Sequence, residues 1–167
     1  MTQEVKRSYL EINSIQDLEE VQKPSVDYSI NLLDPINFQL NKFFYKNIGK
    51  KHRWVDRLVW MESKWIDYVS DKKVKTYVFK YKDDLAGFFE LIFHYEKNEV
   101  EIAYFGLLEE FQNKKLGSYL LSEAIKISFQ NNIDRVWLHT CSLDHKNALN
   151  NYIARGMKIY KTEIVII

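Results

Sequence analysis

The chain has 167 residues, of which 46% are hydrophobic and 28% charged, and these values exclude collagen-like and disordered chains. Its 24 basic and 23 acidic residues give a net charge of +1, which excludes the strongly basic footprint of a nucleic-acid-binding domain. A single cysteine, Cys141, excludes an internal disulfide and the zinc sites that need two or more cysteines. No apolar run approaches the roughly 18 residues of a membrane span and no signal peptide is seen, so we expect one cytoplasmic domain over 1–167.

Apolar periodicity in the first half of the chain predicts two strands and two helices. Asp34-Pro35 is typical of a helix start, because Asp caps free amides and Pro fits the first helical position. Gly49 is well placed to end that helix in a left-handed conformation. In chain order we expect strands over 9–12 and 28–32, a helix from Asp34-Pro35 to Gly49, and a helix over 61–69.

The second half of the chain begins with runs of β-branched and aromatic residues, separated by hairpin breaks at 82–84 and 97–98. Asp144 is predicted to cap a later helix that Gly156 closes. We expect strands over 74–81, 85–95 and 100–108, a helix over 116–130, a strand over 136–141, a helix near 148–153 and a strand over 158–167. The fold class is therefore α/β (α+β), with a mixed, mostly antiparallel sheet flanked by helices.

The most informative segment runs from Glu101 to Ser118, as a strand, a polar loop and a helix start. The first turn of a helix has free N–H groups and a partial positive charge, so such a loop can bind phosphate. The loop Gln112-Asn-Lys-Lys115-Leu-Gly117 resembles the acyl-CoA loop of the GNAT N-acetyltransferase superfamily, Gln/Arg-x-x-Gly-x-Gly/Ala. Lys115 stands where the first Gly of that pattern usually lies, and a side chain fits there if its φ is negative.

Residues further along the chain strengthen the resemblance, because they occur at the family's spacing. Ala148, Tyr152 and Gly156 match the family pattern Asn-x-x-Ala-x-x-Leu-Tyr-x-x-x-Gly-Phe. His145 replaces the Asn of that pattern, and Met157 replaces its Phe. The resemblance covers roughly the second half of the chain, and the strand over 136–141 corresponds to the family's fifth core strand.

The resemblance implies acetyl-CoA as cosubstrate, in a wedge between the strand ending at Leu108 and the strand over 136–141. It implies that the pyrophosphate lies on backbone amides of 113–118 and that the pantetheine arm pairs with the backbone of 105–107. Lys114 and Lys115 either add charge for the phosphates or are simply solvated. The residues expected to bind the cofactor are Phe105, Gly106, Leu107, Gln112, Asn113, Lys114, Lys115, Leu116, Gly117, Ser118, His145 and Tyr152.

The resemblance also implies catalytic roles in acetyl transfer to an amine. Tyr152 is expected to be the acid that protonates the departing thiolate. The alternative is that Tyr152 only packs in the core. A backbone N–H near Leu107 would donate to the oxyanion. Glu101 is the expected general base. The alternative is that Glu101 is an exposed residue of the strand with no catalytic role. Glu90 and His94 are rivals, because they alternate on the preceding strand and share one face.

Charged and aromatic residues indicate how an acceptor would bind. The segment 83–110 has eight acidic residues and one basic residue, so we expect its field to attract a cationic amine. A cluster of basic and aromatic residues precedes the second predicted helix. Its side chains either line an acceptor pocket or pack against one another, and packing is favoured for Trp60. The cluster consists of His52, Arg53, Trp54, Arg57 and Trp60.

Two features of the C-terminal third have competing interpretations. His139, Cys141, Asp144 and His145 could form a metal site, which is disfavoured because ligands there would block the cofactor. The apolar run 164–167 either pairs across a homodimer or completes the sheet.

We therefore predict an N-acetyltransferase that moves an acetyl group from acetyl-CoA to a primary amine by direct attack in a ternary complex. The thioester is already activated, so positioning of the reactants supplies much of the rate. The alternative is a non-catalytic acyl-CoA-binding sensor or interaction module, which the departures at Lys115 and His145 keep open. An interaction protein with no cofactor is a third possibility, and it requires the amide cradle to be missing or blocked.

Overall fold

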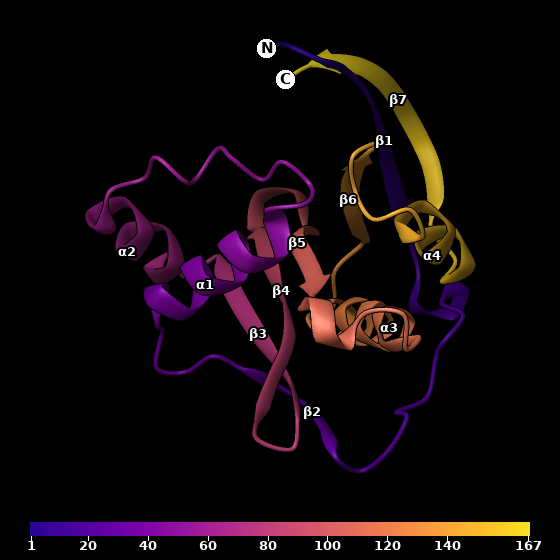
Figure 1. The fold of residues 1–167 in the computed structure, drawn as a ribbon. Helices are drawn as coiled ribbons and strands as arrows, with labels where there is room; N and C mark the ends of the chain where they lie inside the picture. The colour runs from indigo at the N-terminus through magenta and orange to yellow at the C-terminus, as the bar shows by residue number, and fades with distance from the viewer.

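A seven-stranded sheet in the order β2-β3-β4-β5-β6-β1-β7 forms the centre of the computed structural model, which describes residues 1–167 (Figure 1). Neighbouring strands are antiparallel except β5 and β6, which are parallel. The strands are β1 (Glu4–Ile12), β2 (Tyr28–Leu32), β3 (Val74–Tyr81), β4 (Asp84–His94), β5 (Glu99–Leu107), β6 (Arg135–Cys141) and β7 (Lys158–Ile166). The helices are α1 (Phe38–Gly49), α2 (Glu62–Ser70), α3 (Leu116–Phe129) and α4 (Ala148–Ala154), and none is long and apolar enough to cross a bilayer. The α/β class, with its mostly antiparallel sheet, is confirmed.

The helices form a layer on each face of the sheet, with α1 and α2 on one side and α3 and α4 on the other (Figure 1). On the first face, Phe44 of α1 stacks on Phe88 of β4, with ring centroids 5.0 Å apart. On the second face, the apolar stripe of α3 is fully buried against β4, β5 and β6. Alternate residues of a strand point to opposite faces of the sheet, and the side chains on each face here are largely apolar. Each face therefore packs against a layer of helices.

The N-terminal strand lies between two strands from the far end of the chain. β1 pairs with β6 on one side and with β7 on the other. Backbone hydrogen bonds of 2.8 and 2.9 Å between Gln3 and Ile167 bring the two ends of the chain together (Figure 1). β7 therefore completes the sheet as its edge strand, which is one of the two roles expected for the apolar run 164–167. The strand predicted over 9–12 extends back to Glu4, because partners more than 120 residues away decide its length.

The parallel pair β5 and β6 diverges after three paired positions. Glu99, Val100 and Glu101 face Arg135, Val136 and Trp137, and no pairing follows. A register shift between β4 and β5 leaves Ala103 as an extra residue just beyond this point. Such a bulge bends its strand, so β5 turns away from β6 and opens a gap in the middle of the sheet.

Two predicted helix boundaries are wrong in detail. α1 begins at Phe38, not at Asp34-Pro35, because the Asn37 side chain accepts a hydrogen bond of 3.2 Å from the N–H of Leu40. Gly49 is the last residue of α1, but it does not have a positive φ. A Cβ at Gly49 would lie 2.4 Å from the Cβ of Trp54, so close packing excludes a side chain there.

Candidate functional site

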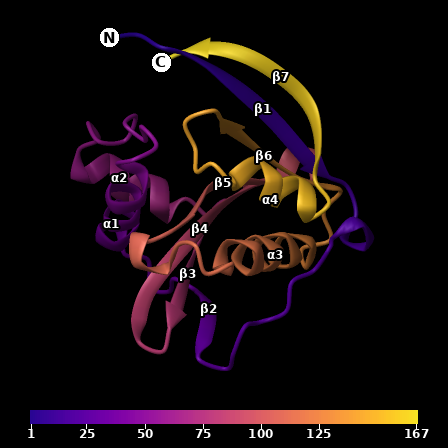
Figure 2. The ribbon, with the colours of Figure 1, turned by 45° about the vertical axis from the view of Figure 1, so that its right-hand side comes forward.

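A cavity of about 1080 Å³ opens where β5 and β6 diverge. Its walls come from β5, β6, the N-terminal end of α3, α4, the segment between α1 and α2, and β1. Figure 2 shows α3 and α4 next to this gap, with β1 and β7 arching beside it. Residues from the helical layers on both faces of the sheet therefore line the cavity.

The loop before α3 forms a cradle of backbone amides on one side of the cavity. Asn113 and Lys115 have φ values of +61° and +62°, while Lys114 between them does not have a positive φ. Alternating backbone conformations of this kind turn successive N–H groups toward one point, where they bind an anion. None of the backbone N–H groups from Asn113 to Ser118 donates to another group of the protein.

Lys115 fits this position without the negative φ expected as the condition for a side chain here. Lys115 adopts the left-handed conformation that glycine favours, with φ +62° and ψ +16°. The backbone of the loop therefore keeps the shape that the family pattern assigns to its first glycine. The side chain extends from the loop, is exposed, and lines the cavity.

Two side-chain hydrogen bonds hold the cradle in place. Gln112 Nε2 donates to the carbonyl oxygen of Leu107 at 3.1 Å, which ties the loop to the end of β5. Asn151 Nδ2 donates to the carbonyl oxygen of Gly117 at 3.2 Å, which ties α4 to α3. A Cβ at Gly117 would contact only Asn151 and Leu107, at 3.8 and 3.9 Å, so the free amides remain open to the cavity.

Eleven of the twelve residues expected to bind the cofactor line the cavity, and Lys114 does not. The Lys114 ammonium lies over the ring of Phe111, 5.6 Å from its centroid. His145 lines the cavity, and its Nδ1 accepts a hydrogen bond of 3.1 Å from the N–H of Asn147. An imidazole at this position therefore forms the local turn for which the family pattern has an asparagine.

Tyr152 is both a core residue and a wall of the cavity. Its ring is buried in the main apolar cluster, 6.4 Å from the ring of Phe105. Its hydroxyl makes no hydrogen bond within the protein, although the residue lines the cavity. Burial, with a smaller contribution from Asp144, raises the pKa of Tyr152, so the phenol stays protonated at neutral pH. The two interpretations offered for this residue are therefore compatible.

Glu101 lies at the point where β5 leaves β6, and its carboxylate is paired with His94. His94 Nε2 and Glu101 Oε1 are 3.0 Å apart, and the Glu101 side chain is 16% exposed. The His94 ring stacks on Trp137. Glu101 lines the cavity and His94 does not, so the imidazole lies behind the carboxylate and orients it.

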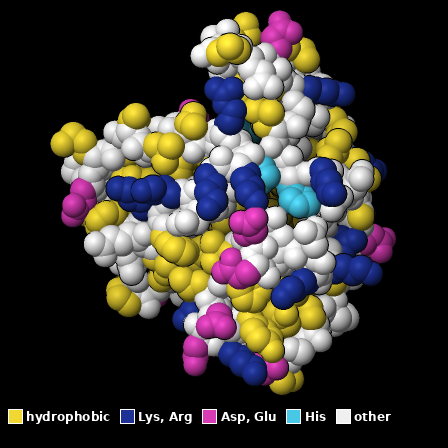
Figure 3. Space-filling model, in the orientation of Figure 1, with side chains coloured by type: hydrophobic (Ala, Val, Ile, Leu, Met, Phe, Trp, Pro, Cys, Tyr) yellow, Lys and Arg dark blue, Asp and Glu magenta, His cyan; other side chains and the backbone are white.

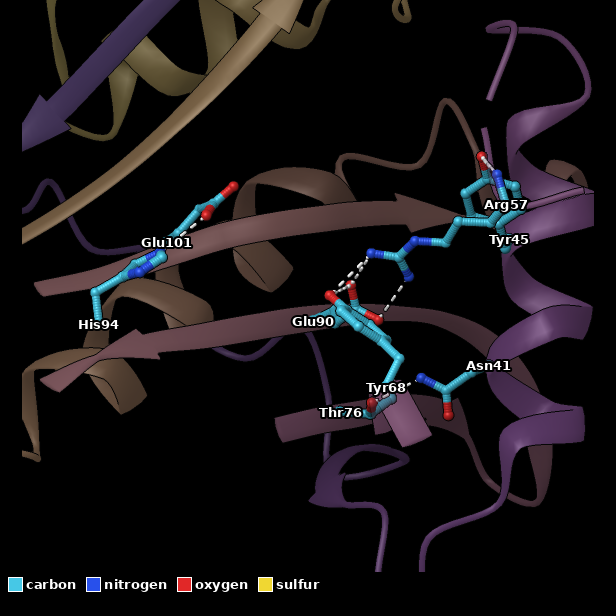
Figure 4. A network of polar contacts seen from close by, with 8 residues as sticks. All are labelled: Asn41, Tyr45, Arg57, Tyr68, Thr76, Glu90, His94 and Glu101. Carbon is cyan, nitrogen blue, oxygen red and sulfur yellow. Dashed lines mark hydrogen bonds and ion pairs between the residues drawn. The ribbon is translucent and has the colours of Figure 1, made fainter. Parts of the chain in front are cut away.

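Glu90 is excluded as a base by its own hydrogen bonds (Figure 4). Its buried carboxylate accepts two hydrogen bonds from the guanidinium of Arg57, at 3.0 and 2.9 Å. The hydroxyl of Tyr68 donates a third, at 2.9 Å. The two rivals to Glu101 therefore have separate roles: His94 acts with Glu101, and the buried Glu90 holds the segment between α1 and α2.

Arg57 is enclosed by aromatic rings as well as by Glu90. Its guanidinium carbon lies 4.2 Å from the ring centroid of Tyr68 and 4.4 Å from that of Tyr104. Burial alone would lower the pKa of Arg57, but the facing Glu90 more than offsets this and raises the pKa overall. The expected packing role of Trp60 is confirmed, because its ring contacts Trp65 and lies outside the cavity. Trp54 both lines the cavity and packs on Tyr104.

The expected acidic field over the cavity is wrong. Of the eight acidic residues in 83–110, only Glu101 lines the cavity. Figure 3 shows Lys and Arg side chains on both sides of the histidines at the centre of this face, with Asp and Glu side chains below them. The acidic residues adjoin in sequence but occupy hairpin turns and both faces of two strands, so their charges do not converge.

The run from His139 to His145 has structural partners. Asp144 accepts hydrogen bonds from the hydroxyl of Thr140 and the N–H of Cys141, so it closes the turn after β6 and does not cap α4. Asn147 is the residue at the cap of α4. Burial raises the pKa of the Cys141 thiol, which leaves it a poor nucleophile. No group of three or more potential ligands in the chain could hold a metal ion.

Two cavity residues escaped prediction as parts of an acceptor site. Arg7 comes from β1, whose place in the sheet has no local signal in the sequence. The sequence pattern indicates His139 only as a potential metal ligand, yet it lines the cavity on β6, the strand next to that of Glu101. The alternation of β6 could have shown that His139 and Trp137 share a face.

Comparison with known families and structures identifies the fold. The family model described as "Acetyltransferase (GNAT) family" matches residues 37–157. No curated protein sequence matches the chain. A conserved protein of unknown function from Staphylococcus epidermidis has 18% sequence identity and a TM-score of 0.67, over 99% of this chain and 62% of that one.

Two acetyltransferase structures are also similar. A GCN5-related N-acetyltransferase from Sphaerobacter thermophilus has 10% identity and a TM-score of 0.75, over 97% of this chain and 50% of that one. A spermidine N-acetyltransferase from Vibrio cholerae, solved with CoA and spermine, has 17% identity and a TM-score of 0.65, over 86% of this chain and 96% of that one. These identities establish the fold alone, and the chain spans only part of the first two structures. With the family match over most of its length, the chain belongs to the GNAT acetyltransferase family.

Proposed function

We propose that the chain is an acetyl-CoA-dependent N-acetyltransferase that acetylates a primary amine by direct attack in a ternary complex. The observation that supports this most is the cavity itself, which joins the amide cradle of α3 to the carboxylate of Glu101 through the gap in the sheet. Family membership supports acyl transfer in general. The residues of the cavity support the more specific proposal of acetyl transfer from acetyl-CoA to a primary amine.

The residues around the gap fit an acyl-CoA. The free N–H groups from Asn113 to Ser118 would bind a pyrophosphate, and Lys115 adds a positive charge beside them. The unpaired edge of β5 from Phe105 to Leu107 would hydrogen-bond an extended pantetheine arm as a strand does. When bound, acetyl-CoA supplies an activated thioester.

Each catalytic residue has one task in transfer. Glu101, oriented by His94, removes a proton from the ammonium so that the amine nitrogen has a free electron pair. A backbone N–H near Leu107 donates to the carbonyl oxygen as negative charge develops on it. The new N–C bond forms as the C–S bond breaks, and Tyr152 donates its proton to the departing sulfur. The hydroxyl of Tyr152 has no partner within the protein that would compete for this proton. The nitrogen then loses its second proton, which restores the phenol of Tyr152, and Glu101 releases the first proton to solvent.

The test is release of free CoA thiol in a screen of primary amines, comparing the native protein with Tyr152→Phe. We expect Tyr152→Phe to lower kcat by about 10²- to 10⁴-fold. Its melting temperature should not change, because the hydroxyl makes no hydrogen bond. Binding of acetyl-CoA without thiol release by any amine would refute catalysis and leave a non-catalytic acyl-CoA-binding module. Unchanged kcat in Tyr152→Phe would refute the role of this residue.

A further inference from the structure

Arg7 lines the cavity, and its guanidinium donates no hydrogen bond to any group of the protein. It lies on β1 opposite Cys141 of β6, and its side chain is 30% exposed. Its Nε is buried and has no hydrogen-bond partner, and neither terminal nitrogen donates to any group of the protein. Of the six buried side-chain atoms that lack a hydrogen-bond partner, Arg7 Nε alone belongs to a residue that lines the cavity, so a ligand is the natural partner of this guanidinium.

The nearest carboxylate does not neutralise Arg7. Glu163 Oε1 lies 3.8 Å from Arg7 Nη1, beyond hydrogen-bond distance. The same oxygen accepts a hydrogen bond of 2.7 Å from the hydroxyl of Tyr9, and Lys161 Nζ lies 3.6 Å from the other oxygen. One carboxylate thus faces two cations, which leaves a surplus positive charge at this end of the cavity.

Arg7 and Glu101 lie on the same face of the sheet, with His139 between them. Register pairs join Glu101 to Trp137 across β5 and β6, and Cys141 to Arg7 across β6 and β1. His139 lies between Trp137 and Cys141 on β6, with its side chain on that face. Burial lowers the pKa of His139, Arg7 lowers it further and Glu101 raises it, and the effects of these two charges agree with the register positions. This face of the cavity therefore has a positive end at β1 and a negative end at β5.

We propose that the acceptor is an amine that also has a carboxylate, such as a free amino acid, and that Arg7 binds the carboxylate while Glu101 receives the amine. The inference rests on the proposed function. A guanidinium binds a carboxylate through two parallel hydrogen bonds, which suits a side chain whose donors are all free. The exposed Arg53, whose Nη1 donates to Gln3 at 3.1 Å, adds a second positive charge to the same wall.

A polycationic acceptor fits this cavity poorly. Besides Glu101, the carboxylates that line the cavity are Asp144 and the exposed Asp56. Asp144 is already engaged by the hydroxyl of Thr140 and the N–H of Cys141. A polyamine would place its further ammonium groups near Arg7 and Arg53, where like charges repel. The bipolar arrangement instead matches one positive and one negative group on the same small molecule.

The experiment compares amino acids with the amines that lack only the carboxylate: leucine with isopentylamine, phenylalanine with 2-phenylethylamine, and lysine with cadaverine. Two readouts are used: thiol release from acetyl-CoA, and the melting temperature of CoA-loaded protein with each compound. The variants are Arg7→Gln, the conservative Arg7→Lys, and Lys161→Gln. Lys161 is a matched control, because it is also a cation beside Glu163 but does not line the cavity.

We expect the native protein to prefer at least one amino acid over its matched amine. Arg7→Gln should raise KM for that amino acid about 10- to 100-fold with little change in kcat, as for loss of a charged hydrogen-bonded pair. Arg7→Lys should restore part of the affinity. Lys161→Gln leaves every donor of Arg7 in place but leaves Glu163 facing Arg7 alone, so it should raise KM much less than Arg7→Gln does. Preference for the decarboxylated amines, equal binding by native and Arg7→Gln proteins, or no binding of any amino acid would overturn the inference. Selective binding without thiol release would instead refute the proposed function and leave the carboxylate site in place.

Discussion

The buried ion pair of Arg57 and Glu90 allows a sharp test of how the wall of the cavity is held. Glu90 is fully buried, and its carboxylate accepts three hydrogen bonds, two from Arg57 and one from Tyr68. Glu90→Gln keeps the volume but removes the charge, so the guanidinium of Arg57 is left buried without a counter-ion. Breaking a buried pair in this way costs about 3–5 kcal/mol. We therefore expect the melting temperature to fall by about 6–20 °C.

The matched variant is the double substitution Arg57→Met with Glu90→Leu, which removes both charges from the same space. Replacing both members of a buried pair by apolar groups is often close to neutral, so the double variant should lie within about 1 kcal/mol of the native protein. Urea unfolding of the native protein, Arg57→Met, Glu90→Leu and the double variant closes the cycle and measures the coupling directly.

Two outcomes of this cycle would refute the reasoning. A loss below about 1 kcal/mol in Glu90→Gln would mean that the pair is not desolvated as the structure indicates. A double variant as unstable as the single one would mean that the aromatic rings around Arg57 need the guanidinium itself. As a smaller reference, Tyr68→Phe removes a hydroxyl that donates to Glu90 and accepts from Arg57 but leaves both charges in place, and it should cost about 1.5–3 kcal/mol.

Two further predictions concern the loop and pH. Lys115→Gly should raise the free energy of unfolding by about 0.5–1 kcal/mol in urea titrations, because it relieves a left-handed L residue, whereas Lys114→Gly should not raise it. Burial first, and Arg7 second, lower the pKa of His139 below its ordinary value of 6.5, so the unfolded chain binds more protons there than the folded one. The resulting stability is fully present above about pH 6.5 and is lost as the pH falls, and His139→Gln should reduce this loss. Arg7→Gln should raise the pKa of His139 in an NMR titration, and an unchanged pKa would contradict their proximity.

The second half of the fold was largely predictable because its signals are local. The hairpins between β3, β4 and β5 end at the expected breaks, where Lys82 and Asn98 have positive φ. Gly156 closes α4 as expected, with φ +104° and a Cβ position 2.1 Å from the carbonyl oxygen of Asp17. In each case a short stretch of sequence determines the turn.

The features that prediction missed depend on distant partners. Nothing in the residues of β1 indicates that it enters the sheet between β6 and β7, so Arg7 could not be assigned to the cavity. The choice between Glu90 and Glu101 as base also depends on tertiary partners, because Arg57 comes from a segment between two helices. The prediction of an acidic field from residues 83–110 was wrong for the same reason. Charges that are adjacent in the sequence separate in space, because alternate residues of a strand point to opposite faces and the hairpins turn the chain.

Binding of acetyl-CoA tests the account most directly. The measurement is the melting temperature with and without acetyl-CoA for native protein, Gly117→Trp, and Gln39→Trp as a control on the exposed side of α1. A Cβ at Gly117 meets only ordinary contacts, so the tryptophan would extend over the free amides of the cradle without disturbing the fold. We predict that acetyl-CoA raises the melting temperature of the native and Gln39→Trp proteins and not that of Gly117→Trp. No rise in the native protein at millimolar acetyl-CoA, or an equal rise in Gly117→Trp, would contradict the assignment of this cradle as the acyl-CoA site.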